Sequence, residues 1–233
     1  MFVKALINAS LICLLGYGCL FGSQTGAYAV ENKLVGDASK ASRTRTKISN
    51  ARPDGKGFLV HEVESEFQAG KTQIRVLLPD NLEKDRRYPV VYVLPVEPQN
   101  EYRFGDGLAE FKKINAHNKY KIICVAPTFC DWPWYCDHPT DPTIRQESYL
   151  TKAVVPMIER TYSTIPNRQG RLLLGFSKSG RGAYSLLLRN PDVFGRAVAW
   201  DAPVMGRGLM NCDAAPHLGH EGKFRTLPYY FAP

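Results

Sequence analysis

The sequence predicts an α/β fold built on a mostly parallel sheet. Four continuous apolar runs have the length and composition of strands buried on both faces, at residues 88–94, 121–126, 171–176 and 196–200. Segments with helical character follow the first three runs, at residues 108–115, 142–162 and 183–189. Strands that alternate with helices indicate βαβ units with right-handed crossovers, and hence a three-layer sandwich.

The fold is expected to begin with an antiparallel hairpin. Residues 58–67 and 72–78 are strand-like, and Gly70 suits the turn between them. Before them, residues 30–56 are polar and basic, with turn-forming residues, and predict a flexible lead segment. The predicted domain therefore spans residues 57–205, and residues 206–233, where the periodicity is lost, form an irregular tail.

The first 29 residues have the pattern of a secretory signal peptide. Lys4 precedes an apolar run over residues 5–21, and Ala27-Tyr28-Ala29 provides a cleavage site after Ala29. An uncleaved membrane anchor is the alternative, because the run is near the lower limit for spanning a bilayer. We expect a secreted or periplasmic protein without membrane contact after cleavage, since no later segment is apolar for long enough.

The chain carries a net charge of +8, which would permit contact with nucleic acid. However, the basic residues are scattered among acidic ones, and the densest basic stretch, residues 40–52, lacks interleaved aromatic residues. This stretch is typical of a solvated linker. We therefore expect no nucleic-acid partner.

Cysteine spacing suggests one disulfide and no metal site. The cysteines that remain after residue 29 are Cys124, Cys130, Cys136 and Cys212. Cys130 and Cys136 are the pair closest in sequence, so a disulfide between them is possible in an oxidising compartment. Cys124 lies inside an apolar run and is expected to be a buried free thiol. Only His217 and His220 approach zinc-ligand spacing, and two residues do not make a site, so neither a metal nor a cofactor is expected.

The strongest chemical signal is the turn at residues 175–180, where a predicted strand ends and a helix begins. A serine on so sharp a turn is held in a strained conformation that exposes its hydroxyl, which makes Ser177 a candidate nucleophile. The positions two before and two after must be small, as Gly175 and Ser179 are. A plain βα turn is the alternative. A phosphate-binding loop is excluded because Arg181 and Gly182 replace the required Lys-Ser/Thr.

Residues 58–205 resemble the family named "putative esterase", which contains esterase D and feruloyl esterases, within the α/β-hydrolase superfamily. The likeness depends on residues 88–94, the turn 175–177 with Gly180, the helix ending at 155–162, and the Asn-Pro-Asp-Val-Phe-Gly segment at 190–195. The resemblance implies an α/β-hydrolase-like fold that is incomplete at its C-terminus.

The resemblance also implies a reaction, the hydrolysis of a carboxylic ester through an acyl-enzyme on Ser177. The oxyanion would be bound by the backbone N–H of Lys178 and by a second N–H from the loop after Leu94. This second donor is Val96 or Glu97, because the prolines that flank them have no N–H. The Lys178 side chain is expected to point to solvent.

In this superfamily an acid and then a histidine follow the serine, normally after two further strands. Only 56 residues (233 − 177) follow Ser177, so the usual positions are missing. Asp201 is a candidate acid, and His217 or His220 a candidate base. The other interpretation is that Asp201 caps a turn and both histidines are surface groups. The chain would then be a non-catalytic or truncated relative, acting at most as a binding module.

An aromatic loop between the second strand and the long helix is a candidate substrate site. Exposed faces of Trp132, Trp134 and Tyr135 could stack on a sugar ring, which predicts a small-molecule or carbohydrate-linked ester as substrate. The alternative is that these side chains anchor the loop to the domain. Oligomeric state is not predicted.

Overall fold

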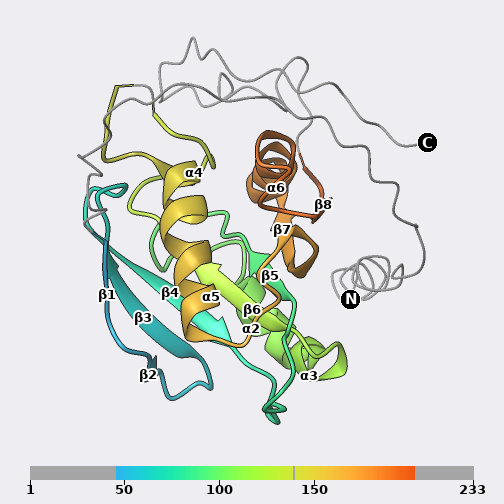
Figure 1. The fold of residues 1–233 in the computed structure, drawn as a ribbon. Coiled ribbons are helices and arrows are strands. Elements are labelled where there is room, and N and C mark those ends of the chain that lie inside the picture. Colours follow the sequence, from blue (N-terminus) through green and yellow to red (C-terminus); the bar gives the residue numbers. More distant parts are fainter. Residues whose placement is uncertain (1–45, 139, 203–233) are drawn as a thin grey trace, which may run out of the picture. The chain divides into compact units, whose positions relative to one another are not determined.

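An eight-stranded mixed sheet forms the centre of the computed structural model, which describes residues 46–138 and 140–202 (Figure 1). The strand order is β1-β3-β4-β6-β5-β7-β8, and β2 also pairs with β3. The strands are β1 (Lys47–Ile48), β2 (Arg52–Pro53), β3 (Leu59–Glu64), β4 (Lys71–Leu77), β5 (Val90–Val93), β6 (Ile123–Pro127), β7 (Arg171–Phe176) and β8 (Arg196–Trp200). The predicted signal peptide, most of the lead segment and the tail lie outside the described residues.

The helical segments mostly follow the predicted strand–helix alternation. They are α2 (Gly107–Lys113), α3 (Ala116–Lys119), α4 (Gln146–Ser148), the π-helical segment η1 (Tyr149–Val154), α5 (Val155–Thr161), the 3-10 turn η2 (Arg168–Gly170) and α6 (Ser177–Arg189). Within the described ranges, no helix combines the length and apolar character that a membrane span needs.

The pairing of the strands confirms the predicted mixture of directions. β3 and β4 form the N-terminal antiparallel hairpin, and β4 joins the rest of the sheet through an antiparallel pairing with β6. β5 lies between β6 and β7 and is parallel to both, and β8 continues the parallel part beyond β7. The four apolar runs of the sequence are therefore four neighbouring parallel strands.

The prediction of a flexible segment up to residue 56 is wrong for the residues that the structure describes. β1 and β2 both pair with β3, and the Arg52 guanidinium lies 2.5 Å from the Glu62 carboxylate across the β2–β3 pair. Gly55 allows the turn between β2 and β3, with φ of 75°. Backbone pairing along one edge of β3 orders these polar residues, and composition carries no signal of it.

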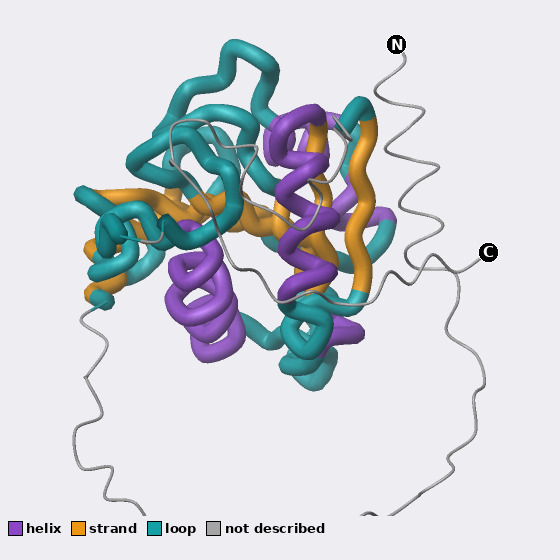
Figure 2. The backbone as a smooth tube through the Cα atoms, turned by 90° about the horizontal axis from the view of Figure 1, so that it is seen from above, coloured by secondary structure: helices purple, strands orange, loops and turns teal. Residues whose placement is uncertain are grey.

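Helices cover both faces of the sheet (Figure 2). A Cβ added to Gly107 at the start of α2 would lie 2.7 Å from Val93 Cγ1, so α2 packs on the Val93 side of β5. Tyr92 points to the other face, because side chains alternate along a strand. There it joins one buried cluster with Val154 and Ile158 of the long helical segment and Leu186 of α6.

The long helical segment begins later than the sequence predicts. Asp141, directly before the predicted start of the helix, accepts a hydrogen bond from Thr143 N (2.8 Å) and so forms a turn. Helix α4 starts at Gln146, where Asp137 accepts a hydrogen bond from Ser148 N (2.8 Å). The π-helical segment η1 ends at Val154, two residues before Pro156 in the first turn of α5, where the missing N–H of a proline is tolerated.

Candidate active site

Ser177 lies at the junction of β7 and α6 and has a φ of 51°. This left-handed conformation is rare for residues other than glycine and costs free energy. It ends the strand abruptly, and the residue becomes the first of a 13-residue helix. The backbone of Ser177 thus has the strain that the sequence predicted for this turn.

Small residues allow strand and helix to close around Ser177. A Cβ at Gly175 would overlap the Ser179 carbonyl, so no other residue fits there without rearrangement. Ser179 is fully buried, and its Oγ accepts a hydrogen bond from Phe176 N (3.0 Å) and donates one to Phe176 O (2.9 Å). These contacts hold the turn from both sides.

The loop after β5 contains the predicted oxyanion donors. Leu94 N donates to Leu174 O (2.9 Å), which keeps the start of this loop beside β7. Among the described residues, neither Val96 N nor Glu97 N has a hydrogen-bond acceptor. Lys178 N lies in the first turn of α6, where helix N–H groups have no intrahelical acceptor. Lys178 N and one of the two loop N–H groups, Val96 N or Glu97 N, remain the predicted oxyanion donors.

The Glu97 side chain has a separate structural role. Its carboxylate is only 2% exposed and accepts hydrogen bonds from Phe104 N (3.2 Å) and Arg103 Nε (3.3 Å). These bonds fold the segment between β5 and α2 back onto itself. A buried carboxylate therefore lies in the same loop as the predicted oxyanion donors.

The three aromatic residues of the loop after β6 have different surroundings. Trp132 is 40% exposed and Trp134 is partly buried, so both have surface available. Tyr135 is fully buried in the main hydrophobic cluster, and the prediction that it is available for stacking is wrong. Local sequence carries no signal of this burial, because the three aromatic residues lie within four positions of one another.

Gln146 fixes this loop and was not identified from the sequence as a site residue. Its side chain is almost fully buried and accepts hydrogen bonds from Trp134 N (2.8 Å) and Tyr135 N (2.9 Å). The same amide donates to Trp132 O (2.8 Å). One side chain thereby satisfies three backbone groups of the aromatic loop and fixes it to the start of α4.

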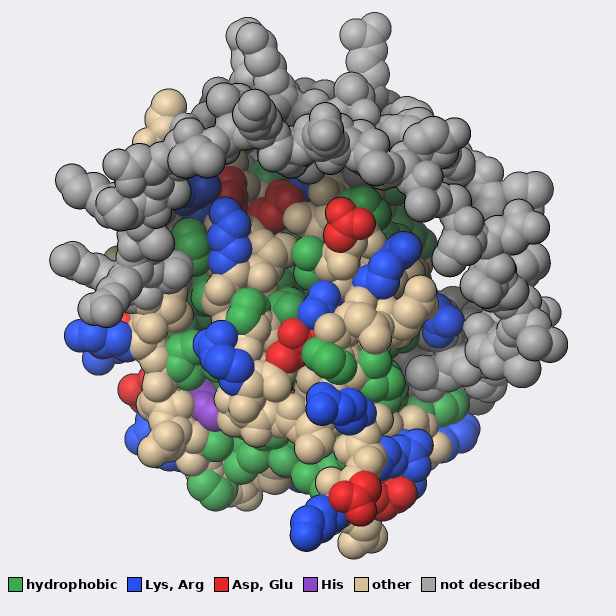
Figure 3. Space-filling view, viewed as in Figure 1, with side chains coloured by type: hydrophobic (Ala, Val, Ile, Leu, Met, Phe, Trp, Pro, Cys, Tyr) green, Lys and Arg blue, Asp and Glu red, His purple; other side chains and the backbone are tan. Residues whose placement is uncertain are grey.

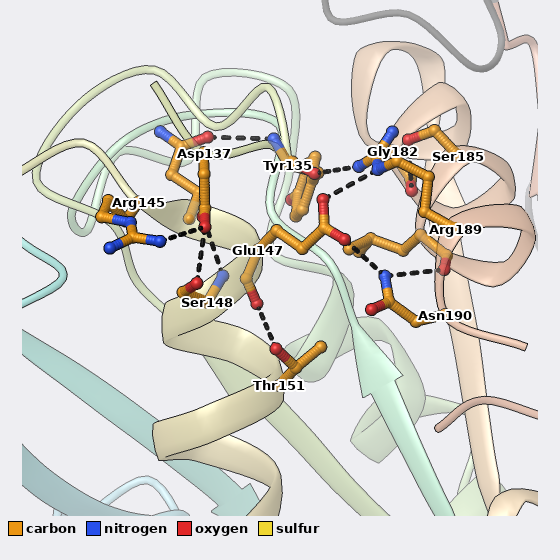
Figure 4. Close-up of polar contacts among 12 residues, drawn as sticks. Tyr135, Asp137, Arg145, Glu147, Ser148, Thr151, Gly182, Ser185, Arg189 and Asn190 are labelled. Carbon is orange, nitrogen blue, oxygen red and sulfur yellow. Dashed lines mark hydrogen bonds and ion pairs between the residues drawn. The ribbon is translucent and has the colours of Figure 1, made fainter. Parts of the chain in front are cut away.

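Tyr135 connects the aromatic loop to the nucleophile helix (Figure 4). Its hydroxyl donates to Pro95 O in the loop after β5, and its own carbonyl accepts from Arg189 Nη2 (2.5 Å). Its ring fills the space where Gly182 of α6 has no side chain. Arg189 also pairs with the Glu147 carboxylate at 2.8 Å, which joins α6 to α4.

Lys178 does not point to solvent as the sequence suggested. Its Nζ lies 4.2 Å from the ring centroid of Trp132 and 5.0 Å from that of Trp134. Burial lowers the pKa of Lys178 to about 8, although the carboxylates of Glu97 and Asp131 oppose this shift. An ammonium over the faces of two indoles is a favourable cation–π arrangement. The spacing of these residues in the sequence does not predict it.

Asp201 directly follows β8, the strand beside β7. The last paired residues of these two strands are Phe176 and Trp200, so Ser177 and Asp201 each come one residue after the pairing ends. Asp201 is exposed and has a φ of 51°. The candidate bases His217 and His220 lie outside the described residues.

The three described histidines have partners away from this turn. His61 bonds Ser49 O (2.8 Å) and the Tyr162 hydroxyl (2.7 Å), and His117 Nε2 lies 3.9 Å from an Asp80 carboxylate oxygen. His138 Nδ1 accepts from Asp141 N (2.8 Å). These contacts give none of the three a role beside Ser177.

The predicted disulfide between Cys130 and Cys136 is not formed. Cys136 is disulfide-bonded, whereas Cys124 and Cys130 are free thiols. Tyr135, directly before Cys136, is anchored in the core, whereas Cys130 Sγ points to Lys71 O in the hairpin. The two cysteines are therefore close in sequence but held by different parts of the fold. Cys124 is buried, as predicted, and burial raises the pKa of its thiol.

On the face shown in Figure 3, Lys and Arg side chains lie among Asp and Glu side chains instead of in one basic patch. Within the described ranges, no group of three or more His, Cys, Asp or Glu residues could hold a metal ion.

Strand order, helical layers and the strained serine turn together define an α/β-hydrolase fold. A family model described as "Putative esterase" matches residues 65–207, and the chain belongs to this family. A solved ferulic acid esterase is 23% identical with a TM-score of 0.51, over 69% of this chain and 61% of that one. An S-formylglutathione hydrolase from Agrobacterium tumefaciens is 17% identical with a TM-score of 0.53, over 67% and 62%. At these identities the likeness concerns the fold, and this chain spans about three fifths of each structure's length.

Proposed function

We propose that this protein hydrolyses carboxylic esters through an acyl-enzyme on Ser177. The observation that carries the proposal is the left-handed backbone of Ser177 at the end of β7, with φ of 51°. Ser177 Oγ attacks the ester carbonyl, the new Oγ–C bond forms, and the C–O bond to the alcohol breaks. The serine proton passes through a base to the departing alcohol, and water then releases the acid.

Backbone donors would stabilise the negative charge that develops in this reaction. Lys178 N belongs to the first turn of α6, and the candidates for the second donor are Val96 N and Glu97 N after β5. A backbone N–H aimed at the oxyanion contributes a factor of about 10²–10³ to kcat. The lack of other described acceptors for the two loop N–H groups supports this assignment.

The proton relay is assigned to Asp201 with His217 or His220. Asp201 is supported by its position one residue beyond the β7–β8 pairing, beside the end of the nucleophile strand. Both histidines follow Asp201 in the order that the superfamily uses. A neutral imidazole would take the serine proton, and the carboxylate would orient the ring.

The proposed substrates are small-molecule or carbohydrate-linked esters, with Trp132 and Trp134 as the binding surface. The exposed face of Trp132 supports this role. Tyr135 is left out because it is buried. The N-terminal pattern of residues 1–29 further supports a secreted or periplasmic location.

A fluorophosphonate probe and p-nitrophenyl ester turnover test the proposal. Wild type should be labelled and active, and Ser177→Ala should lose both properties. Ser185→Ala is the matched control, because Ser185 lies on the same helix and donates to Gly182 O, and it should be labelled like the wild type. Labelling that is absent from the wild type, or unchanged in Ser177→Ala, would exclude the mechanism.

A non-catalytic binding module is the second candidate. It is favoured by the engagement of all three described histidines in other contacts. Loss of measured turnover in His217→Ala or His220→Ala, without loss of folding, would rule out this alternative. Carbohydrate binding without turnover would support it.

A further inference from the structure

We propose that Lys178 determines the substrate specificity of this site, by selecting esters that carry a carboxylate close to the reacting carbonyl. This inference rests on the proposed function and names its substrate class. The carbohydrate member of that class would be a uronic acid that is acylated on a hydroxyl and keeps its carboxylate free. The small-molecule member would be a monoester of a dicarboxylic acid.

Lys178 is next to the candidate nucleophile in sequence and extends toward the aromatic loop. Lys178 directly follows Ser177, and consecutive Cα atoms are about 3.8 Å apart. Its side chain is directed to the aromatic loop, where Nζ lies over both Trp132 and Trp134. The ammonium therefore lies between the aromatic loop and the first turn of α6, which begins at Ser177.

The ammonium of Lys178 also has hydrogen-bond donors to offer a ligand. An ammonium has three N–H donors and needs acceptors for them when it is removed from water. Lys178 is partly buried, yet its Nζ makes only the two cation–π contacts and has no hydrogen bond or ion pair to any residue in ranges 46–138 and 140–202. Indole faces supply no acceptor, so the donors are available to a ligand with oxygen atoms.

Both carboxylates near Lys178 already have other donors. Glu97, from the loop after β5, accepts from Arg103 Nε (3.3 Å) and from Phe104 N (3.2 Å). Asp131, from the loop after β6, accepts from Trp132 N (2.6 Å). They attract the ammonium without contacting it, and Arg103 offsets the charge of Glu97. A substrate carboxylate can therefore form the direct ion pair that the protein leaves unmade.

The same geometry argues against simple stacking of a neutral sugar. The ammonium lies over one face of each indole, so a neutral ring that stacks on that face would have to displace it and lose the cation–π contacts. A carboxylate instead adds to the arrangement, because a charge-assisted hydrogen bond to Lys178 leaves the indole contacts in place.

The preference should depend on pH. Lys178 has a pKa lowered to about 8, so its ammonium is present below that pH and is lost as the pH rises through it. The groups that face it are Glu97, Asp131 and the two indoles. A carboxylate preference is therefore expected at about pH 6.5 and should be lost by about pH 9.5.

Two p-nitrophenyl esters with five-carbon acyl chains provide the test. One is the pentanoate, which is neutral, and the other is the glutarate monoester, which ends in a carboxylate. The measured quantity is the ratio of kcat/KM for the glutarate to kcat/KM for the pentanoate. Lys178→Met should lower this ratio about tenfold or more, equivalent to about 1.4 kcal/mol, and Lys178→Arg should largely restore it. The control Lys152→Met, at an exposed position of η1, should leave the ratio unchanged.

The outcomes separate this inference from the proposed function. Turnover of the pentanoate by wild type supports the esterase even if the ratio is the same in Lys178→Met, and that result would overturn the role of Lys178. If wild type turns over neither ester, the role of Lys178 is tested by measuring the binding of monomethyl glutarate through the change in tryptophan fluorescence. Binding that is tenfold weaker in Lys178→Met supports the inference, and equal or absent binding overturns it.

Discussion

Ser177 and Asp201 occupy equivalent positions at the ends of two neighbouring parallel strands. Each follows the last residue of the β7–β8 pairing, and each has a φ of 51°. The rings of the preceding residues, Phe176 and Trp200, lie 5.6 Å apart and pack side by side. Two residues with the same left-handed backbone conformation therefore place a hydroxyl and a carboxylate at one edge of the sheet, where these parallel strands end.

The left-handed backbone of Ser177 should have a measurable energetic cost. This conformation costs residues other than glycine about 1–2 kcal/mol. A glycine avoids that cost but destabilises the folded state by about 0.5–1 kcal/mol, because its unfolded chain is more flexible. We therefore expect Ser177→Gly to be more stable than Ser177→Ala by roughly 0.5–1 kcal/mol, measured by urea unfolding. Both variants should lack turnover. An equal or lower stability of Ser177→Gly would mean that the turn is unstrained.

Asp201→Asn tests the carboxylate without disturbing its backbone. Asparagine accepts a positive φ as readily as aspartate, so the melting temperature should stay close to that of wild type. Loss of the negative charge should lower kcat about 100-fold if the carboxylate supports the proton relay. The control is Asp192→Asn, at another exposed position just before β8. Full activity in Asp201→Asn would assign Asp201 to the turn alone.

Gly182→Ala should loosen the contact between the nucleophile helix and the aromatic loop. A new Cβ would overlap the Tyr135 ring, and overpacking of this kind costs about 1–3 kcal/mol. Thermal unfolding should show the loss, together with reduced esterase activity. Gly70→Ala is the matched control, because its Cβ would lie 3.7 Å from Cys130 Sγ, an ordinary contact. A Gly182→Ala protein as stable as this control would contradict the packing described here.

Gln146→Leu should release the aromatic loop. The change leaves the N–H groups of Trp134 and Tyr135 without their acceptor, and each unpaired buried group costs about 1–3 kcal/mol. Urea unfolding should show a loss in this range, and tryptophan fluorescence should report greater solvent access. Gln169→Leu, at an exposed position in η2, serves as the control. Unchanged fluorescence and stability in Gln146→Leu would show that other contacts hold the loop.

Most of the sheet was predictable because its central strands are buried on both faces. Continuous apolar runs such as 88–94 and 171–176 are typical of parallel strands that helices cover on both faces. The strands β1 and β2 were missed, because their pairing uses backbone groups and leaves polar side chains in water. The start of the long helix was misplaced, because Asp141 satisfies a turn while Asp137, further from the helix in sequence, accepts from Ser148 N.

The serine turn was also predictable, since only small residues at Gly175 and Ser179 let strand and helix approach so closely. The side chains around it were not. Whether Tyr135 is buried and whether Lys178 meets the two indoles depends on contacts between the aromatic loop and α6, which lie about 40 residues apart in sequence (178 − 135 = 43). Tertiary packing, which local sequence patterns do not encode, decides such contacts.

The burial of Tyr135 limits how the binding surface can be redesigned. Trp132 and Trp134 offer indole faces at the surface and are suitable positions for a library that seeks new substrates. Tyr135, a residue of the aromatic loop, holds two other segments in place. Its hydroxyl bonds to Pro95 O in the loop after β5, and its ring packs against Gly182 of α6. A library that varies all three aromatic residues together would therefore lose most of its members to misfolding, whereas one that keeps Tyr135 constant would sample specificity on an intact scaffold.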